Sequence, residues 1–270
     1  MDIGSIIGLI LGLGAVLAGF LLEGGHLNDL VAQSSPLIIV FGGTFGAVVL
    51  SFPLSEIKQV PAALSTVFKN KKTDPIGIIN HLSELSEKAR KDGLLSLEME
   101  AQNSENEFIR KGLSLVVDGI ETEVIKDILD RELELRESIY EKTAKIFEAA
   151  GGFGPTMGVL GTVMGMINVL GSMGASPDGL GEKIATAFLA TMYGVGFANL
   201  VYIPIGSRIK AKAANERMVN DLIIEGLLSI QAGENPRIIK EKLNLTLIEK
   251  MNGKGEGKKG APAAETEAEG

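Results

Sequence analysis

The stretch GPTMGVLGTVMGMINVLG, residues 154–171, carries a proline, two threonines, an asparagine and a glycine at every third or fourth position, but no charged side chain. It lies within an uncharged window, residues 149–177. A membrane-spanning helix needs about 20 predominantly apolar residues, so this window is long enough to cross a bilayer. Similar windows occur at 3–22, 30–55 and 184–207. We therefore predict an all-α membrane protein with four transmembrane helices, at about 3–22, 36–53, 149–172 and 184–206.

The composition also indicates a membrane protein. Of the 270 residues, 45 % are hydrophobic and 5 % are aromatic, and the mean hydropathy is +0.23. The chain has no cysteine, so neither disulfide bonds nor thiol chemistry is available to it. The two histidines, His26 and His81, are isolated in the sequence, and we expect a surface role for each rather than metal ligation. We expect no cofactor and no nucleic-acid partner.

The first apolar window has a second interpretation, as a signal peptide. It opens with Met1, Asp2 and Ile3, without a basic region, and no small-residue cleavage site ends it. We therefore expect it to stay in the mature protein. The second window contains Pro36, which favours a helix that starts near this residue, with proline in the first turn.

The distribution of lysine and arginine predicts the orientation of the spans. The loops 23–35 and 172–183 contain a single lysine between them. The other connecting segments carry Lys58, Lys69, Lys71, Lys72, Lys142, Lys145, Arg208, Lys210, Lys212 and Arg217. Because basic residues gather on the cytoplasmic side of membrane proteins, we expect both termini and the block 56–147 to lie in the cytoplasm.

The predicted cytoplasmic domain, residues 56–147, has the pattern of a set of helices. Asp74 and Pro75 form an N-cap with proline at the first helical position, and Gly93 is typical of a helix end. The predicted helices cover 74–91, 94–101, 105–117 and a long segment from 121 that continues into the third span.

Two further segments follow the fourth span. Residues 208–250 are predicted to form C-terminal cytoplasmic helices. Residues 251–270 consist largely of Gly, Lys, Glu, Ala and Thr. Such a segment buries too little apolar surface to fold, and we predict a disordered tail.

Small and weakly polar residues share one face of the third and fourth spans. On the third span this face holds Gly151, Pro155, Gly158, Thr162, Gly165, Val169 and Ser172. On the fourth span it holds Ala187, Thr191, Gly194, Ala198 and Val201, and Pro204 lies near the cytoplasmic end. In antiparallel helices that rise about 1.5 Å per residue, Thr162 and Thr191 both lie about 20 Å from the same membrane edge. We predict that the two threonines and the two prolines form one arrangement.

Helix packing alone is the alternative explanation for these faces. Small residues let membrane helices approach closely, and a threonine hydroxyl can bond to the carbonyl four residues earlier. Close packing of the helices explains the glycines better than it explains the paired threonines and prolines. The four predicted spans contain no Asp, Glu, His, Lys or Arg, the side chains that membrane ion relays use. If the chain conducts an ion, the carboxylate must come from another chain.

Three sequence motifs resemble one protein family. They are ARKDGLLSLE at 89–98, GPTMGVLGTVMGMINVL at 154–170 and TMYGVGFANLVYIPI at 191–205. Together with the four predicted spans and the large insert after the second, they are similar to MotA and its relative PomA, the larger stator subunits of the bacterial flagellar motor. The resemblance covers about residues 1–250. It implies a homo-pentamer in the inner membrane, in contact with membrane lipid, around two copies of a MotB-type partner whose single span brings an essential Asp.

The resemblance also implies residues of an ion path. Pro155 and Pro204 match two family prolines that couple ion flow to movement. Thr162 and Thr191 match positions that line the path, so the transported cation, H+ or Na+, would pass them. Sodium-type members tend to have threonine at the position of Thr162, and a hydroxyl oxygen suits a hard cation. The sequence therefore favours Na+ over H+.

A second implied surface contacts the rotor. Arg90 and Glu98 match charges that engage the rotor protein FliG, and Lys91 is a further candidate beside them. Arg90 and Glu98 could lie on separate arms of a turn at Gly93 and present opposite signs to a charged partner. The alternative for each is an ordinary solvated side chain, since exposed ion pairs contribute little to stability.

Other functional classes fit less well. The ExbB and TolQ branch of the same superfamily, which uses a proton gradient to work on the outer membrane, resembles a three-span layout. This chain has one more predicted span, early in the sequence, and this span and the motif at 89–98 argue against that branch. A self-contained transporter or enzyme lacks support, because no embedded charge, nucleotide loop or nucleophile constellation occurs in the sequence. A structural scaffold that conducts nothing is a further alternative.

Overall fold

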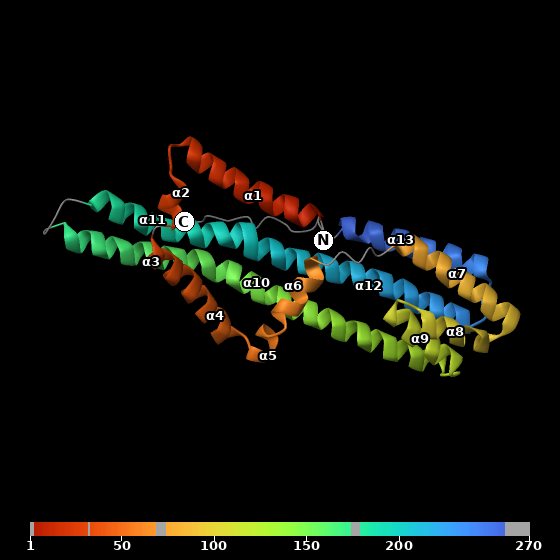
Figure 1. The fold of residues 1–270 in the computed structure, drawn as a ribbon. Helices are drawn as coiled ribbons and strands as arrows, with labels where there is room; N and C mark the ends of the chain where they lie inside the picture. The colour runs from red at the N-terminus through yellow and green to blue at the C-terminus, as the bar shows by residue number, and fades with distance from the viewer. Residues whose placement is uncertain (1–2, 32, 69–73, 174–178, 257–270) are drawn as a thin grey trace, which may run out of the picture. The chain divides into compact units, whose positions relative to one another are not determined.

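Figure 1 shows the chain as a computed structural model that describes residues 3–31, 33–68, 74–173 and 179–256. These residues form α-helices joined by short 3-10 and π-helical segments, and the described ranges contain no strand. The all-α prediction is confirmed for this part of the chain.

The chain divides into two compact units. The first consists of residues 1–71 and 138–213, and the second of residues 72–137 and 214–270. Helix α10, Thr122–Ser172, and helix α12, Ile203–Gln231, contribute to both units. The residues that follow the fourth predicted span therefore share a unit with most of the predicted cytoplasmic domain.

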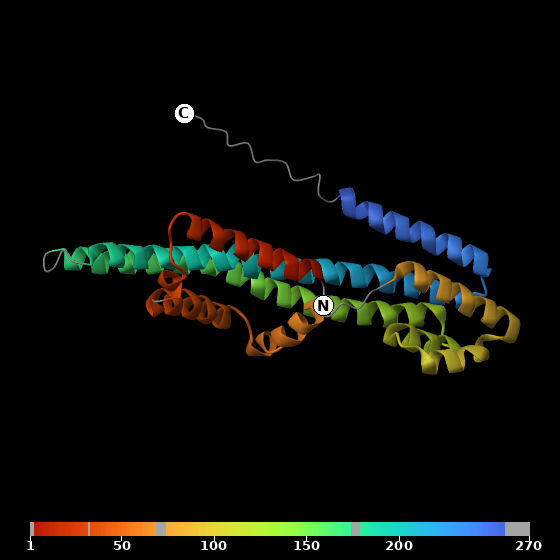
Figure 2. The ribbon, with the colours of Figure 1, turned by 45° about the horizontal axis from the view of Figure 1, so that its top comes forward.

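The first unit holds the apolar helices. Its N-terminal elements are α1, Ile3–Leu22; α2, Leu27–Val31; α3, Ser34–Leu37; the π-helical turn η1, Ile38–Gly42; α4, Gly43–Ser51; α5, Leu54–Ile57; and α6, Val60–Phe68. Helix α11, Leu180–Phe197, lies beside the C-terminal part of α10 and leads through a second π-helical turn, η3, Ala198–Tyr202, into α12 (Figures 1 and 2).

Three helical runs of the described residues are long and apolar enough to cross a membrane. They are Ser34–Ser51, Thr122–Ser172 and Leu180–Gln231. A fourth apolar run, Ile6–Leu22, is shorter and lies within helix α1. The whole of α1, Ile3–Leu22, has 20 residues and extends about 30 Å at about 1.5 Å per residue, which matches a hydrocarbon thickness of about 30 Å. All four predicted spans fall on apolar helices, and the exact number that cross the membrane stays a prediction.

The second unit begins with a helix whose ends follow the local sequence. In α7, Pro75–Asp92, the Asp74 side chain accepts a hydrogen bond from the backbone N–H of Ile76 at 3.1 Å. Gly93 ends the helix with a φ of 81°, in the region that favours glycine. Both predicted ends of this helix are confirmed.

The remaining helices of the second unit pack around one apolar core. They are η2, Leu94–Leu97; α8, Glu98–Asn103; α9, Glu107–Val117; and α13, Pro236–Glu256. Helices α7 and α13 lie side by side (Figure 2). Leu82, Leu113, Leu129 and Leu227, from four different helices, are fully buried in this core. Burial of such side chains is the main favourable contribution to folding.

The C-terminal helix is longer than the sequence predicts. The predicted tail starts at residue 251, whereas α13 continues to Glu256. One face of this helix packs in the core through Ile239, Leu243 and Leu247, which stabilises the helix up to this point. Met251 and Asn252, which follow, are exposed. Residues 257–270 lie outside the described residues.

Candidate functional site

The predicted small faces of α10 and α11 meet in a close helix crossing, which we call the seam. A Cβ atom built on Gly158 would lie 2.9 Å from the carbonyl oxygen of Ala190, and one built on Gly154 would lie 3.0 Å from the carbonyl oxygen of Gly194. The backbones approach so closely that only glycine fits at these positions, as in small-residue contacts between membrane helices.

The seam brings the two predicted threonines into contact. The Oγ1 atoms of Thr162 and Thr191 lie 2.5 Å apart. Thr162 Oγ1 also lies within hydrogen-bond distance of the carbonyl oxygens of Ala187, at 2.9 Å, and Gly158, at 3.1 Å. Thr191 Oγ1 lies 3.4 Å from the Gly158 oxygen. Two hydroxyls and two carbonyl oxygens thus form one cluster, the four-oxygen cluster, within an uncharged part of the helix pair.

The chemistry of the four-oxygen cluster admits two readings. Hydroxyl and carbonyl oxygens are ligands that hard cations accept, and they also accept hydrogen bonds from water. The bond from Thr162 to the carbonyl of Gly158 is the back-bond expected of a threonine that only packs a helix. The pairing of the threonines is observed, and their role in ion passage stays a prediction.

The predicted prolines flank the seam further along the helices. Pro155 lies inside the uninterrupted helix α10, where its missing N–H leaves the carbonyl of Gly151 without its helical partner. Gly151 packs against Ile203, the residue before Pro204, and a Cβ on Gly151 would lie 2.6 Å from Ile203 Cγ1. Pro155 is half-buried and Pro204 is exposed. The turn preceding Pro155 therefore lies against the turn that holds Pro204.

The π-helical turn η3 changes which residues continue the seam. The predicted face runs from Ala198 to Val201, three residues later. In the structure the contact with Gly151 is made by Ile203, five residues after Ala198. A π-helical turn accommodates one additional residue, and this shifts the face that follows. Ile203 therefore joins the seam, and the assignment of Val201 to it stays a prediction.

An ion pair ends the seam beyond the prolines. Lys210 Nζ lies 2.6 Å from Glu148 Oε1. Gly206 leaves room for it, since a Cβ there would lie 3.4 Å from Glu148 Cγ. The sequence analysis did not single out this pair, although Glu148 lies three residues before Gly151 and so extends the small face by one step.

The predicted rotor-contacting residues surround the turn at Gly93 in the second unit. Arg90 lies in the last turn of α7 and Glu98 begins α8, so the two charges occupy opposite arms of the turn. Both side chains are exposed, and within the described residues neither has an ion-pair partner. Lys91 differs, because its hydrogen bond with Glu87, at 2.5 Å, raises the pKa of the lysine.

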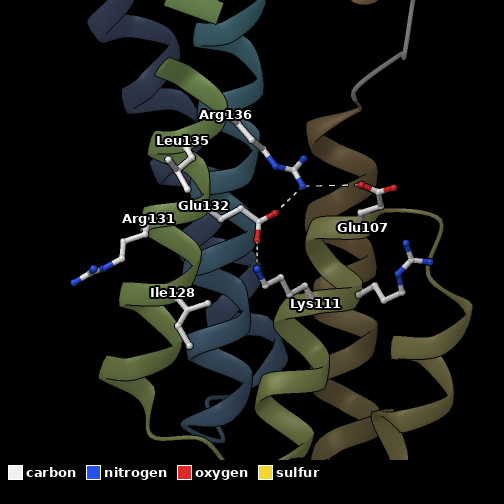
Figure 3. A pocket seen from close by; sticks show the side chains of 8 residues that line it. Glu107, Lys111, Ile128, Arg131, Glu132, Leu135 and Arg136 are labelled. Carbon is white, nitrogen blue, oxygen red and sulfur yellow. Dashed lines mark hydrogen bonds and ion pairs between the residues drawn. The ribbon is translucent and has the colours of Figure 1, made fainter. Parts of the chain in front are cut away.

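A charged cavity of about 610 Å³ lies between α9 and α10 in the second unit (Figure 3). Glu132 accepts hydrogen bonds from Lys111 and from Arg136, whose guanidinium also lies over the ring of Phe108. Burial raises the pKa of Glu132, but the hydrogen bonds from the two cations outweigh it and lower the pKa overall. The cavity is held together by its own ion pairs, and the sequence analysis did not predict it.

The chain is similar to known proteins over most of its length. Residues 6–93 match the motility protein A N-terminal family, and residues 100–222 match the MotA/TolQ/ExbB proton channel family. Motility protein A of Bacillus subtilis is 38 % identical over 92 % of this chain and 91 % of its own. The chain belongs to the motility protein A family.

Two solved structures of this family have the same fold. The flagellar MotAB stator complex from Bacillus subtilis matches with a TM-score of 0.84 and 37 % identity, over 90 % of this chain and 95 % of that chain. The C. jejuni MotAB structure matches with a TM-score of 0.85 and 31 % identity, over 91 % and 96 %.

The predicted function and family are therefore confirmed. As a member of the motility protein A family, the chain is a stator subunit of the flagellar motor and not an enzyme. The match of residues 6–93 to the motility protein A N-terminal family favours this branch over the ExbB and TolQ branch.

Proposed function

We propose that the chain is the larger subunit of an ion-driven stator, and that a MotB-type partner with one transmembrane helix completes its ion path. Two of the similar structures are MotAB complexes, which supports a partner of this kind. The partner brings the membrane carboxylate that this chain lacks, since the predicted spans contain no ionisable side chain of the types that relay ions.

The four-oxygen cluster is the observation that carries this proposal. Thr162 and Thr191 place two hydroxyls together in an uncharged seam, with the Gly158 and Ala187 carbonyl oxygens within reach. A cation bound to the partner's carboxylate would find these oxygens on the opposite wall. The path carries H+ or Na+, and we favour Na+ because the Thr162 hydroxyl is a suitable ligand for a hard cation.

The same proposal includes the topology and assembly. All four apolar helices, α1 included, cross the bacterial inner membrane, with both termini and the second unit in the cytoplasm. This orientation rests on the excess of lysine and arginine in the predicted cytoplasmic segments. Five copies surround two copies of the partner, and the exposed apolar side chains of the first unit contact membrane lipid or a neighbouring copy.

The prolines provide the mechanical link in this proposal. Pro155 removes one hydrogen bond from α10, and Pro204 follows the π-helical turn η3. Missing or displaced backbone hydrogen bonds are the usual places where a helix bends. Gly151, in the turn before Pro155, packs against Ile203, the residue before Pro204. A bend in one helix therefore moves the other helix.

The rotor contact is assigned to the turn at Gly93. Arg90 and Glu98 have no ion-pair partner within the described residues, so both charges are available to the rotor protein FliG. Lys91 belongs to the same surface, but it has to give up its ion pair with Glu87 in order to bind the rotor. Charge reversal at Arg90 or Glu98 should weaken motility, and a compensating reversal on the rotor should restore part of it. Motility that is independent of the rotor's charges would overturn this assignment.

The ion path is tested by reconstituting the chain in vesicles with and without its partner. Ion flux should require the partner and should fall strongly in Thr162→Val and Thr191→Val, which keep the side-chain shape but remove the hydroxyl, whereas Thr162→Ser should retain flux. Thr156→Val is a matched control, since Thr156 is exposed and bonds only to the carbonyl of Phe153 among the described residues.

Three outcomes would each contradict a part of the proposal. Equal flux through the chain alone would show that it carries its own ion site. Flux in Thr162→Val equal to that in Thr156→Val would remove the four-oxygen cluster from the path. Flux that is unchanged in sodium-free medium at a fixed proton gradient would exclude Na+ and leave H+.

A further inference from the structure

Two large apolar side chains stand exposed on the turn that follows Gly93. Leu95 is 73 % exposed and Met99 is 69 % exposed, the highest values for large apolar residues described in the second unit. They lie four residues apart, in the 3-10 turn η2 and at the start of α8. Methionine is common at binding surfaces because its side chain adapts its shape.

The turn that presents these side chains is well fixed. Gly93 adopts a φ of 81°, and the Ser96 hydroxyl donates to its carbonyl oxygen at 2.6 Å. Leu97, between the two exposed residues, is fully buried in the core of the second unit. An apolar pair on a rigid support loses little conformational entropy when a partner covers it.

Free charges of both signs flank the apolar pair. Arg90 lies on the α7 side and Glu98 lies between Leu95 and Met99, and neither has an ion-pair partner in the described part of the chain. The neighbouring charges are engaged within the unit, where Lys88 pairs with Glu100 at 2.9 Å and Lys91 pairs with Glu87. The surface thus has an apolar centre and a rim with unpaired charges, which is the arrangement of a protein–protein interface.

We infer that Leu95 and Met99 are the apolar anchors of the rotor contact, and that they cover an apolar side chain of the rotor protein that is flanked by one acidic and one basic residue. This inference rests on the proposed function, which assigns only the charges of this surface. The unpaired charges of opposite sign stand at fixed positions beside the apolar pair, which favours a protein surface with complementary charges over lipid, whose headgroup charges have no fixed arrangement. A second copy of the chain is the competing occupant.

The charges and the apolar pair have different tasks in this arrangement. Exposed charges guide association and set orientation, whereas desolvated apolar anchors near the centre hold most of the affinity. Replacing an anchor should therefore speed dissociation, and reversing a rim charge should slow association and make it depend on salt.

The test measures binding of the purified rotor protein to the complete stator complex in nanodiscs, together with swimming speed. Leu95→Ala and Met99→Ala should each weaken binding about tenfold, mainly through faster dissociation, and lower the speed. Leu95→Met should keep most of the affinity. Ile76→Ala is the matched control, because Ile76 is 63 % exposed and lies in the first turn of α7, at the end of that helix opposite to Gly93.

Each other outcome overturns the inference. If the Ala variants bind the rotor as well as Ile76→Ala does, while Arg90 or Glu98 reversal still weakens binding, the anchors are wrong and the proposed rotor contact stands. If the variants dissociate the stator complex without changing rotor binding, the surface joins copies of this chain. If neither the anchors nor the charges affect binding, the rotor contact itself fails.

Discussion

Replacement of Gly158 by alanine tests the seam most directly. The new Cβ would lie 2.9 Å from the carbonyl oxygen of Ala190 and 3.1 Å from Thr191 Cα. Both of these are backbone atoms, so neither can turn away as a flexible side chain would. The helices α10 and α11 must separate by a few tenths of an ångström to restore ordinary van der Waals contact.

The expected cost combines two opposing effects. Overpacking of a tight contact costs about 1–3 kcal/mol, whereas exchanging glycine for alanine inside a helix favours folding by about 1 kcal/mol. Gly152→Ala isolates the second effect, because a Cβ at Gly152 meets nothing within 4 Å. Gly158→Ala should therefore be less stable than Gly152→Ala by about 1–3 kcal/mol.

The same separation should disturb the four-oxygen cluster. Thr191 Oγ1 already lies 3.4 Å from the Gly158 oxygen, near the limit for a hydrogen bond. Thermal unfolding of the purified complex measures the stability difference, and ion flux in vesicles measures the functional one. If Gly158→Ala matches Gly152→Ala in both measurements, the close crossing has no energetic or functional consequence and the reasoning about the seam is wrong.

Three further predictions concern other contacts. Pro155→Ala and Pro204→Ala should permit assembly but reduce torque in tethered-cell rotation, because each supplies a backbone N–H that can form the helical hydrogen bond whose absence the proposed bending depends on; wild-type torque in both would falsify the coupling role. Glu132→Gln should lower thermal stability by about 1 kcal/mol at neutral pH, and because the folded pKa of Glu132 is depressed, the difference should shrink as the pH falls below the ordinary value of 4.5. If Glu132→Gln remained less stable than the unsubstituted protein by the same amount at low pH, the stabilising role of the ionised Glu132 would be contradicted. Glu148→Gln and Lys210→Gln should each cost less than about 1 kcal/mol, since the pair is partly exposed; a double-mutant cycle that gives a much larger coupling energy would show that the pair is more deeply desolvated than the single chain indicates.

Helix ends and helix lengths were predictable where they depend on residues close by in the sequence. The cap at Asp74 and the end at Gly93 depend on side chains within a few residues of each helix end. The long helix α10 follows from a run without glycine or proline that leads into an apolar segment. Equal depth in antiparallel helices was enough to predict that Thr162 and Thr191 meet.

Features that depend on distant parts of the chain were not predictable in this way. Neither π-helical turn has a local signature, and the contact between Gly151 and Ile203, which directly follows η3, was not predicted. The second unit combines residues 72–137 with 214–270, far apart in the sequence. Helix α13 is held in the core through Ile239, Leu243 and Leu247, contacts that composition alone does not reveal, and it continues past the predicted start of the tail.

The hydrogen count of the four-oxygen cluster has a consequence for the order of events in the motor. Thr162 and Thr191 have one hydroxyl hydrogen each, and one of the two is needed for the bond between them. The other hydrogen bonds to only one of the two carbonyl oxygens at a time, so the second carbonyl lacks a hydroxyl donor. Hydroxyl groups turn within picoseconds to nanoseconds, while helix movements take microseconds to milliseconds. For the proposed path we therefore expect the hydroxyl groups to reorient around a passing cation before the helices begin to move.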